Sequence, residues 1–103
     1  MRKITLYIGL NDKITKTQKI NTLDAYNVIC NILDTGATIQ EAKGIYKHDD
    51  GTQVIETSLV VELLDFTGDL DRKWLIDKVE AIKEALNQEA VAVQIEEVKS
   101  ELI

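Results

Sequence analysis

The sequence predicts an α+β fold with elements in the order strand, helix, strand, strand, helix, strand. Three observations predict it. Apolar and polar residues alternate in four separate segments, as they do in half-buried strands. Apolar residues recur at helical spacing in two other segments. An Asp-Asp-Gly turn lies between the second and third alternating segments, and such a turn is typical of an antiparallel hairpin.

The first strand is predicted over Lys3–Gly9 and the first helix over about Leu23–Leu33. Asn21, with Asp24 three residues later, resembles the capping box that opens a helix. Gly36 is placed for a left-handed cap after the helix. The residues of these two elements that we expect to face the core are Ile4, Leu6, Ile8, Tyr26, Ile29, Cys30 and Leu33.

The second and third strands are predicted over Thr38–Lys47 and Gln53–Phe66, joined by the turn His48-Asp49-Asp50-Gly51. Neither face of the second strand is cleanly apolar, which is typical of a sheet edge. Gly44 in this strand is a candidate bulge. The third strand is the most apolar segment of the chain. Its residues expected to face the helices are Leu59, Val61 and Leu63.

The second helix is predicted over about Leu70–Asn87, with Asp69 as its N-cap, and the fourth strand begins near Ala90. The tail Glu96–Ile103 keeps apolar residues, so we expect it to pack against the domain. The helix should bury a stripe formed by Leu75, Val79, Ile82 and Leu86.

This order of elements is the split βαβ, or ferredoxin-like, arrangement. We therefore predict a single domain over residues 1–103, with a four-stranded antiparallel sheet in the strand order 4-1-3-2. Both helices should cover the same face of that sheet.

Composition narrows the classes of function. The chain has 103 residues and a formal net charge of −6, and this acidity argues against nucleic acid as the main partner, because proteins that bind phosphate backbones carry basic patches. No apolar run approaches the roughly 18 residues of a membrane span. A single cysteine allows no internal disulfide, so a reducing, cytoplasmic location is expected.

The sheet face turned away from both helices, called the open face below, is too apolar for a surface left entirely to water. A homo-oligomer, dimer or trimer, or a bound small molecule or host protein would explain it. An exposed face of mixed polarity is the plainer alternative. The residues predicted on the open face are Thr5, Tyr7, Val60, Glu62, Leu64, Ala90, Ala92 and Gln94.

Candidate ligand or interface residues lie on the open face, on the arm Tyr46–Glu56 between the second and third strands, and on the second helix. Trp74, one residue off the stripe of that helix, is either an exposed interface anchor or packed near the end of the sheet. The candidates are Tyr7, Tyr46, His48, Val60, Glu62, Leu64 and Trp74.

Lys13, Lys16 and Lys19 form the one local basic cluster, within the polar loop Leu10–Ile20. They are candidates for binding a phosphate or an acidic partner, whereas a solvated loop is the commoner meaning of such a run.

The sequence indicates no catalytic constellation, cofactor motif or metal site. It contains no Gly-x-Ser-x-Gly and no phosphate-binding glycine loop. One histidine and one cysteine are too few for a zinc site, and the turn explains His48-Asp49-Asp50-Gly51 without a metal. Cys30 is expected to be a buried structural thiol.

Three classes of function remain. The first is a small acidic binding or regulatory oligomer that acts through the open face and the arm. The second is an inhibitor or decoy of a host protein, encoded by a phage or mobile element, since an acidic surface can occupy a basic channel. The third is a dimeric ferredoxin-like enzyme with a pocket between sheet and helices, for which Tyr7, Tyr46 and His48 are the polar candidates.

Three stretches together resemble an uncharacterised family of small bacterial proteins, a domain of unknown function. They are Leu6-Tyr7-Ile8-Gly9-Leu10, the segment from Glu41 through Asp50-Gly51 to Val60, and Gln88-Glu89-Ala90-Val91. The resemblance covers nearly the whole chain and implies a ferredoxin-like fold, and it transfers no catalytic residue because none is established for that family. This chain departs from the family in its shorter, charged stretch before the second helix.

Gly36 followed by Thr38-Ile39-Gln40-Glu41-Ala42-Lys43-Gly44 resembles the second strand of the PII and CutA proteins. That resemblance implies a trimer with a nucleotide held between subunits. The connection between the second and third strands is much shorter here, and no basic motif stands near the fourth strand to hold phosphates.

Overall fold

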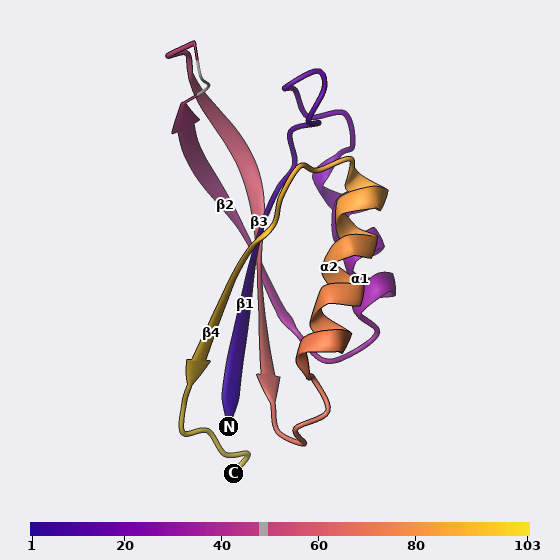
Figure 1. Ribbon diagram of the computed structural model, residues 1–103, viewed down its shortest axis with the longest axis vertical. Coiled ribbons are helices and arrows are strands. Elements are labelled where there is room, and N and C mark those ends of the chain that lie inside the picture. Colours follow the sequence, from indigo (N-terminus) through magenta and orange to yellow (C-terminus); the bar gives the residue numbers. More distant parts are fainter. Residues whose placement is uncertain (48–49) are drawn as a thin grey trace.

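The computed structural model describes residues 1–47 and 50–103 (Figure 1). Within these residues the chain forms six elements, which follow one another as predicted. They are β1 (Arg2–Gly9), α1 (Thr22–Leu33), β2 (Thr38–Lys47), β3 (Gln53–Asp65), α2 (Arg72–Leu86) and β4 (Ala92–Glu97).

The strands form one antiparallel sheet in the order β2-β3-β1-β4. Figure 1 shows both helices on one side of this sheet and none on the other. The βαββαβ order and the strand order confirm the predicted ferredoxin-like α+β fold. The outer part of the β2–β3 hairpin, which carries the arm, extends beyond the layer of helices, beside the loop that follows β1.

The core lies between the sheet and the two helices. Ile4, Leu6 and Ile8 of the central strand β1 are fully buried, because alternate residues of a strand share one face. The buried residues that pack around them are Leu10, Ala25, Ile29, Leu33, Leu59, Val61, Leu63, Leu75, Ile82 and Leu86. Val79 of the predicted stripe is partly buried against this cluster.

Helix α1 begins where the sequence predicts. Asn21 is its N-cap, and the side-chain oxygen of Asn21 accepts a hydrogen bond from the Asp24 N–H. The predicted cap at the other end is wrong. Asp34, with φ 49°, takes the left-handed position directly after Leu33, so the helix has already ended before Gly36. A short polar Asp side chain tolerates that conformation.

Two further local predictions are wrong. The N-cap of α2 is Asp71, which accepts from the Trp74 N–H, whereas Asp69 belongs to the preceding turn. The pairing of β2 with β3 continues through Gly44 opposite Glu56 without an extra residue, so Gly44 is not a bulge.

Cys30 is half-buried rather than buried, and Tyr26 on the same helix is exposed. The side-chain hydrogen bond to Cys30 raises the pKa of the Tyr26 phenol. The buried stripe of α1 is Ala25, Ile29 and Leu33. A stripe that begins at Ala25 leaves Tyr26 and Cys30, each one position further along the helix, at its flank.

The C-terminal tail does not pack as expected. Strand β4 runs to Glu97, and the Val98 N–H donates to the Met1 carbonyl. Beyond that point Leu102 is 88% exposed and Ile103 is exposed as well. The tail therefore leaves the open face uncovered. None of the helices in the part of the chain that the structure describes is long and apolar enough to cross a membrane.

Candidate functional site

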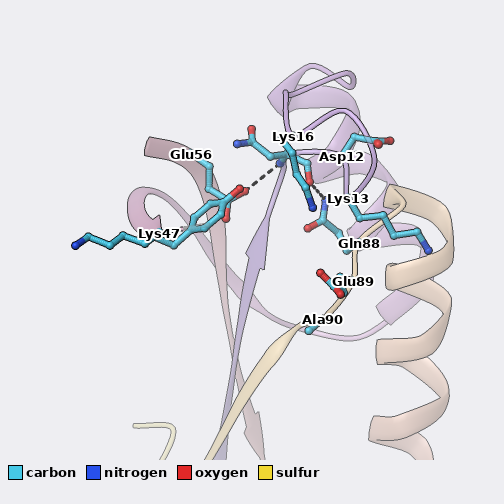
Figure 2. A pocket seen from close by; sticks show the side chains of 10 residues that line it. Asp12, Lys13, Lys16, Lys47, Glu56, Gln88, Glu89 and Ala90 are labelled. Carbon is cyan, nitrogen blue, oxygen red and sulfur yellow. Dashed lines mark hydrogen bonds between the residues drawn. The ribbon is translucent and has the colours of Figure 1, made fainter. Parts of the chain in front are cut away.

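A polar pocket of about 330 Å³ lies where the arm, the loop after β1 and the connection from α2 to β4 meet (Figure 2). It is on the open face, because Glu56 stands four positions before Val60 on β3 and such residues share a face. The arm contributes Tyr46, Lys47 and Glu56; the loop contributes Asn11, Asp12, Lys13 and Lys16; and the connection contributes Gln88, Glu89 and Ala90.

Glu56 forms one wall of the pocket, and its position depends on Gly9. A Cβ at Gly9 would lie 2.7 Å from Glu56 Oε2 and from Glu56 Cδ, so the carboxylate occupies the space that a side chain at Gly9 would need. The Asn11 N–H donates to Glu56 Oε2 at 3.1 Å. The half-buried carboxylate is thus held against the end of β1, and Tyr46 lines the same pocket.

Gln88 closes the floor of the pocket. Its side chain is buried, and its Nε2 donates to the carbonyl oxygens of Asn11 at 2.7 Å and Leu86 at 3.3 Å. Figure 2 shows the first of these bonds linking the connection after α2 to the loop after β1. The amide therefore joins two segments that are 77 residues apart and fixes the floor below Glu56.

Asp12 anchors the loop after β1 to the end of α2. Its Oδ1 accepts from the N–H groups of Ile14 and Thr15, and its Oδ2 accepts from Asn87 Nδ2 at 2.8 Å. The hydrogen bond from Asn87, followed by those from Ile14 and Thr15, lowers the pKa of the Asp12 carboxyl from 3.8 to about 2. Asp12 is therefore a structural residue of the pocket rather than a free ligand group.

This anchoring predicts a stability that depends on pH. Because the pKa of Asp12 is lower in the folded chain, its contribution is complete above about pH 3.8 and is lost as pH falls through about 2. Asp12→Asn should be less stable than the unchanged chain at pH 7, and the difference should shrink at pH 2.5. Urea unfolding at both pH values measures it, and an equal difference at the two pH values would contradict the assignment.

The structure brings together three of the residues singled out from the sequence. Tyr46 of the arm and Lys13 and Lys16 of the loop line the same pocket, whereas Lys19 lines a separate pocket together with Leu86 and Asn87. His48 lies outside the described residues.

The other predicted candidates lie elsewhere. Tyr7 is 44% exposed on the open face, where its hydroxyl donates to Gln94 Oε1, and Leu64 is 40% exposed. Val60 and Glu62 are half-buried between them. Thr5, although on this face, is only 4% exposed. Trp74 is half-buried against the core on the helical side, with Lys78 Nζ 5.9 Å from its ring centroid.

Asn11, Asp12 and Gln88 line or shape the pocket and were not singled out from the sequence, nor was Gly9 beneath Glu56, and Glu56 was named only as the end of the arm. A single signal was available for one of them. A glycine that ends an apolar strand indicates a close approach of another group, and that group is Glu56. The enzyme hypothesis placed a pocket between sheet and helices, whereas this pocket lies on the opposite face of the sheet.

The part of the chain that the structure describes contains no cluster of three or more His, Cys, Asp or Glu side chains that could hold a metal ion. Asp65, which the sequence places near other acidic residues, instead accepts from the Gly68 N–H at 2.9 Å and pairs with Arg2 at 3.5 Å. Its carboxylate closes the turn after β3.

Comparison with known proteins gives the fold and one nearer likeness. No family model matches the chain, and no curated protein matches it. Among solved structures, a phage SAM lyase in its apo state is 25% identical, with a TM-score of 0.66 over 92% of this chain and 78% of that one. A phage SAM lyase in complex with S-methyl-5′-thioadenosine is 24% identical, with a TM-score of 0.64 over 93% and 80%.

Two more distant structures share the fold alone. A DUF3240 family protein from Shewanella baltica is 8% identical, with a TM-score of 0.52 over 99% of this chain and 94% of that one. CutA1 from Oryza sativa is 17% identical, with a TM-score of 0.51 over 99% and 84%. The resemblance to CutA proteins predicted from β2 is thus confirmed at the level of the fold. The chain shares its ferredoxin-like fold with CutA1, with a protein of a domain of unknown function, and with phage SAM lyase.

Proposed function

We propose that this chain binds S-adenosylmethionine in the pocket beside Glu56 and cleaves it to release S-methyl-5′-thioadenosine. The observation that carries the proposal is the half-buried carboxylate of Glu56, held over Gly9 in a polar pocket on the open face. The likeness to a phage SAM lyase over 92% of the chain supplies the class of ligand.

The pocket has the chemistry that this ligand requires. S-adenosylmethionine carries two positive groups, a sulfonium and an ammonium, together with a carboxylate and an adenine. Glu56 offers a negative partner for a positive group. The ring of Tyr46 beside it offers a face for the sulfonium or the adenine. A volume of about 330 Å³ falls within the range of small-molecule sites.

The proposed cleavage breaks the bond between the sulfur and the four-carbon chain of the ligand, and the sulfur keeps the electron pair. Two routes balance. In the first, the carboxylate of the ligand attacks the carbon that the sulfur leaves and forms a lactone. In the second, the four-carbon chain gives a proton from the neighbouring carbon to the Glu56 carboxylate and forms an alkene. Both routes give S-methyl-5′-thioadenosine without any oxidant, reductant or water.

The experiment incubates the purified chain with S-adenosylmethionine and follows S-methyl-5′-thioadenosine by mass spectrometry. We expect its release, and NMR of the four-carbon product distinguishes lactone from alkene. Binding of S-adenosylmethionine without release would contradict the cleavage step and favour the binding or regulatory protein predicted from the sequence. Absence of both binding and release would contradict the whole proposal.

A homo-oligomer would complete this site, and we include it in the proposal. The arm, the loop and the connection after α2 form the walls of the pocket and leave one side open. Small-molecule sites usually bury 70–90% of the ligand surface, so a further wall is needed. The open face exposes Tyr7, two residues before Gly9, and Leu64 toward the other end of the sheet. A second copy placed on this face would cover both the apolar residues and the open side of the pocket.

Val60→Lys is expected to break that association, because it places a charge at the centre of the proposed contact. Light scattering after size-exclusion chromatography should then give about 11.6 kDa for the variant and a multiple of this mass for the unchanged chain. Ile76→Lys is the control, since Ile76 is exposed on α2, on the other side of the sheet. A monomeric unchanged chain would contradict the proposed oligomer.

A further inference from the structure

Lys16 has an unusual backbone conformation in the loop after β1. Its φ of 62° lies in the left-handed region, which costs a residue with a side chain about 1–2 kcal/mol. Strained residues of this kind concentrate at functional sites. Figure 2 shows the side chain of Lys16 pointing toward Gln88, whereas that of Lys13 points toward α2. Lys16 therefore brings its ammonium group into the pocket from a conformation that the loop imposes.

The loop imposes this conformation through Asp12. The Lys16 N–H donates to the Asp12 carbonyl at 2.8 Å, and the Asp12 N–H donates to the Thr17 carbonyl at 2.8 Å. The Asp12 side chain is tied in turn to Asn87, which stands in the left-handed position that ends α2. The Lys13 N–H donates to the Asn87 carbonyl at 3.0 Å, so backbone and side chain of Asn87 both hold the loop.

We propose that Lys16 binds the carboxylate of the ligand, and that Asp12 and Asn87 are positioning residues that hold Lys16 in place. The inference rests on the proposed function, because it assigns one end of the proposed ligand to one side of the same pocket. Glu56 and Lys16 both line it, on opposite segments, the arm and the loop. A ligand with a positive and a negative end is oriented by such a pair, its positive end toward Glu56 and its carboxylate toward Lys16.

Binding of two nucleosides distinguishes a ligand-binding role of Lys16 from a purely structural one. S-adenosylhomocysteine keeps the amino-acid chain with its carboxylate and lacks the sulfonium, so the proposed cleavage does not consume it. S-methyl-5′-thioadenosine lacks the carboxylate. Calorimetric titration with both nucleosides compares the unchanged chain with Lys16→Ala. Lys19→Ala is the matched control, since Lys19 belongs to the same loop and does not line this pocket.

Lys16→Ala should weaken binding of S-adenosylhomocysteine about tenfold, or about 1.4 kcal/mol, and should leave S-methyl-5′-thioadenosine within twofold. Lys19→Ala should change neither. Equal losses for both nucleosides in Lys16→Ala, or no loss for either, would overturn the assignment while leaving the proposed function in place. An unchanged chain that binds neither nucleoside would overturn the proposed function itself.

The positioning residues are tested by moving the carboxylate from position 12 to position 87. Asn87→Asp places a second carboxylate against Asp12, in place of the amide that now donates at 2.8 Å. We expect a selective loss for S-adenosylhomocysteine. The double variant Asp12→Asn with Asn87→Asp restores an amide–carboxylate pair and should recover that loss. A double variant that folds and stays as weak as Asn87→Asp contradicts the positioning role. If Asn87→Asp does not fold, the double variant is compared with the unchanged chain. A selective loss of S-adenosylhomocysteine binding in the double variant would then contradict the positioning role.

Discussion

Glu56→Gln is expected to lower kcat/KM for the release of S-methyl-5′-thioadenosine about 100-fold. Glutamine keeps the shape of the side chain and an oxygen for the Asn11 N–H, so it removes the charge and little else. A hydrogen bond to a charged group contributes about 1.5–3 kcal/mol, and 100-fold corresponds to about 2.7 kcal/mol. Initial rates at several concentrations of S-adenosylmethionine measure the effect.

Glu41→Gln is the matched control for this variant. Glu41 lies on the neighbouring strand β2 and pairs with Leu59, so it shares the helical side of the sheet with that core residue. Its substitution removes the same charge from the protein and leaves the pocket intact. A similar loss of rate in both variants would show that net charge matters and that the position of Glu56 does not.

Gly9→Ala is expected to lower the same rate at least tenfold without unfolding the chain. The added Cβ would lie 2.7 Å from Glu56 Oε2, so the carboxylate must swing away and lose its bond to the Asn11 N–H. The atoms that must move are the end of a flexible side chain, and alanine in a strand is favoured over glycine by about 0.5–1 kcal/mol. Stability should therefore stay within about 1 kcal/mol.

Gly44→Ala gives the comparison for Gly9→Ala. Gly44 lies opposite Glu56 in the β2–β3 pairing, and its added Cβ would meet Ser58 Oγ at 3.4 Å, an ordinary contact. Rates and thermal unfolding of both variants are measured together. Full activity in Gly9→Ala would show that the held position of Glu56 is not needed, and unfolding in that variant alone would show that Gly9 serves the fold instead.

The elements of this fold could be predicted from the sequence because each has a periodicity of its own. Ile4, Leu6 and Ile8 alternate, and Leu75, Ile82 and Leu86 recur at helical spacing. The caps were harder to predict. Asp34 takes a left-handed position although Gly36 stands two residues later, and Asp71 caps α2 although Asp69 stands two residues before it. At each end several residues suit the cap, and tertiary packing selects one of them.

The pocket could be predicted only in part because its residues are distant in sequence. Tyr46 and Lys16 were candidates for their chemistry, whereas Glu56 was named only as the end of the arm and Gln88 only within a family resemblance. Glu56 differs from other surface acids by its contact with Gly9 and Asn11, which are 47 and 45 residues away. A contact across β1 and β3 depends on strand register, and the alternation within each strand does not by itself separate one register from another shifted by two residues.

The most direct test of the account is a crystal structure of the chain with S-methyl-5′-thioadenosine. The account predicts the nucleoside on the open face, in the pocket lined by Tyr46, Glu56 and Gln88. A nucleoside bound on the helical side of the sheet, or bound on the open face without contact to these residues, would contradict it.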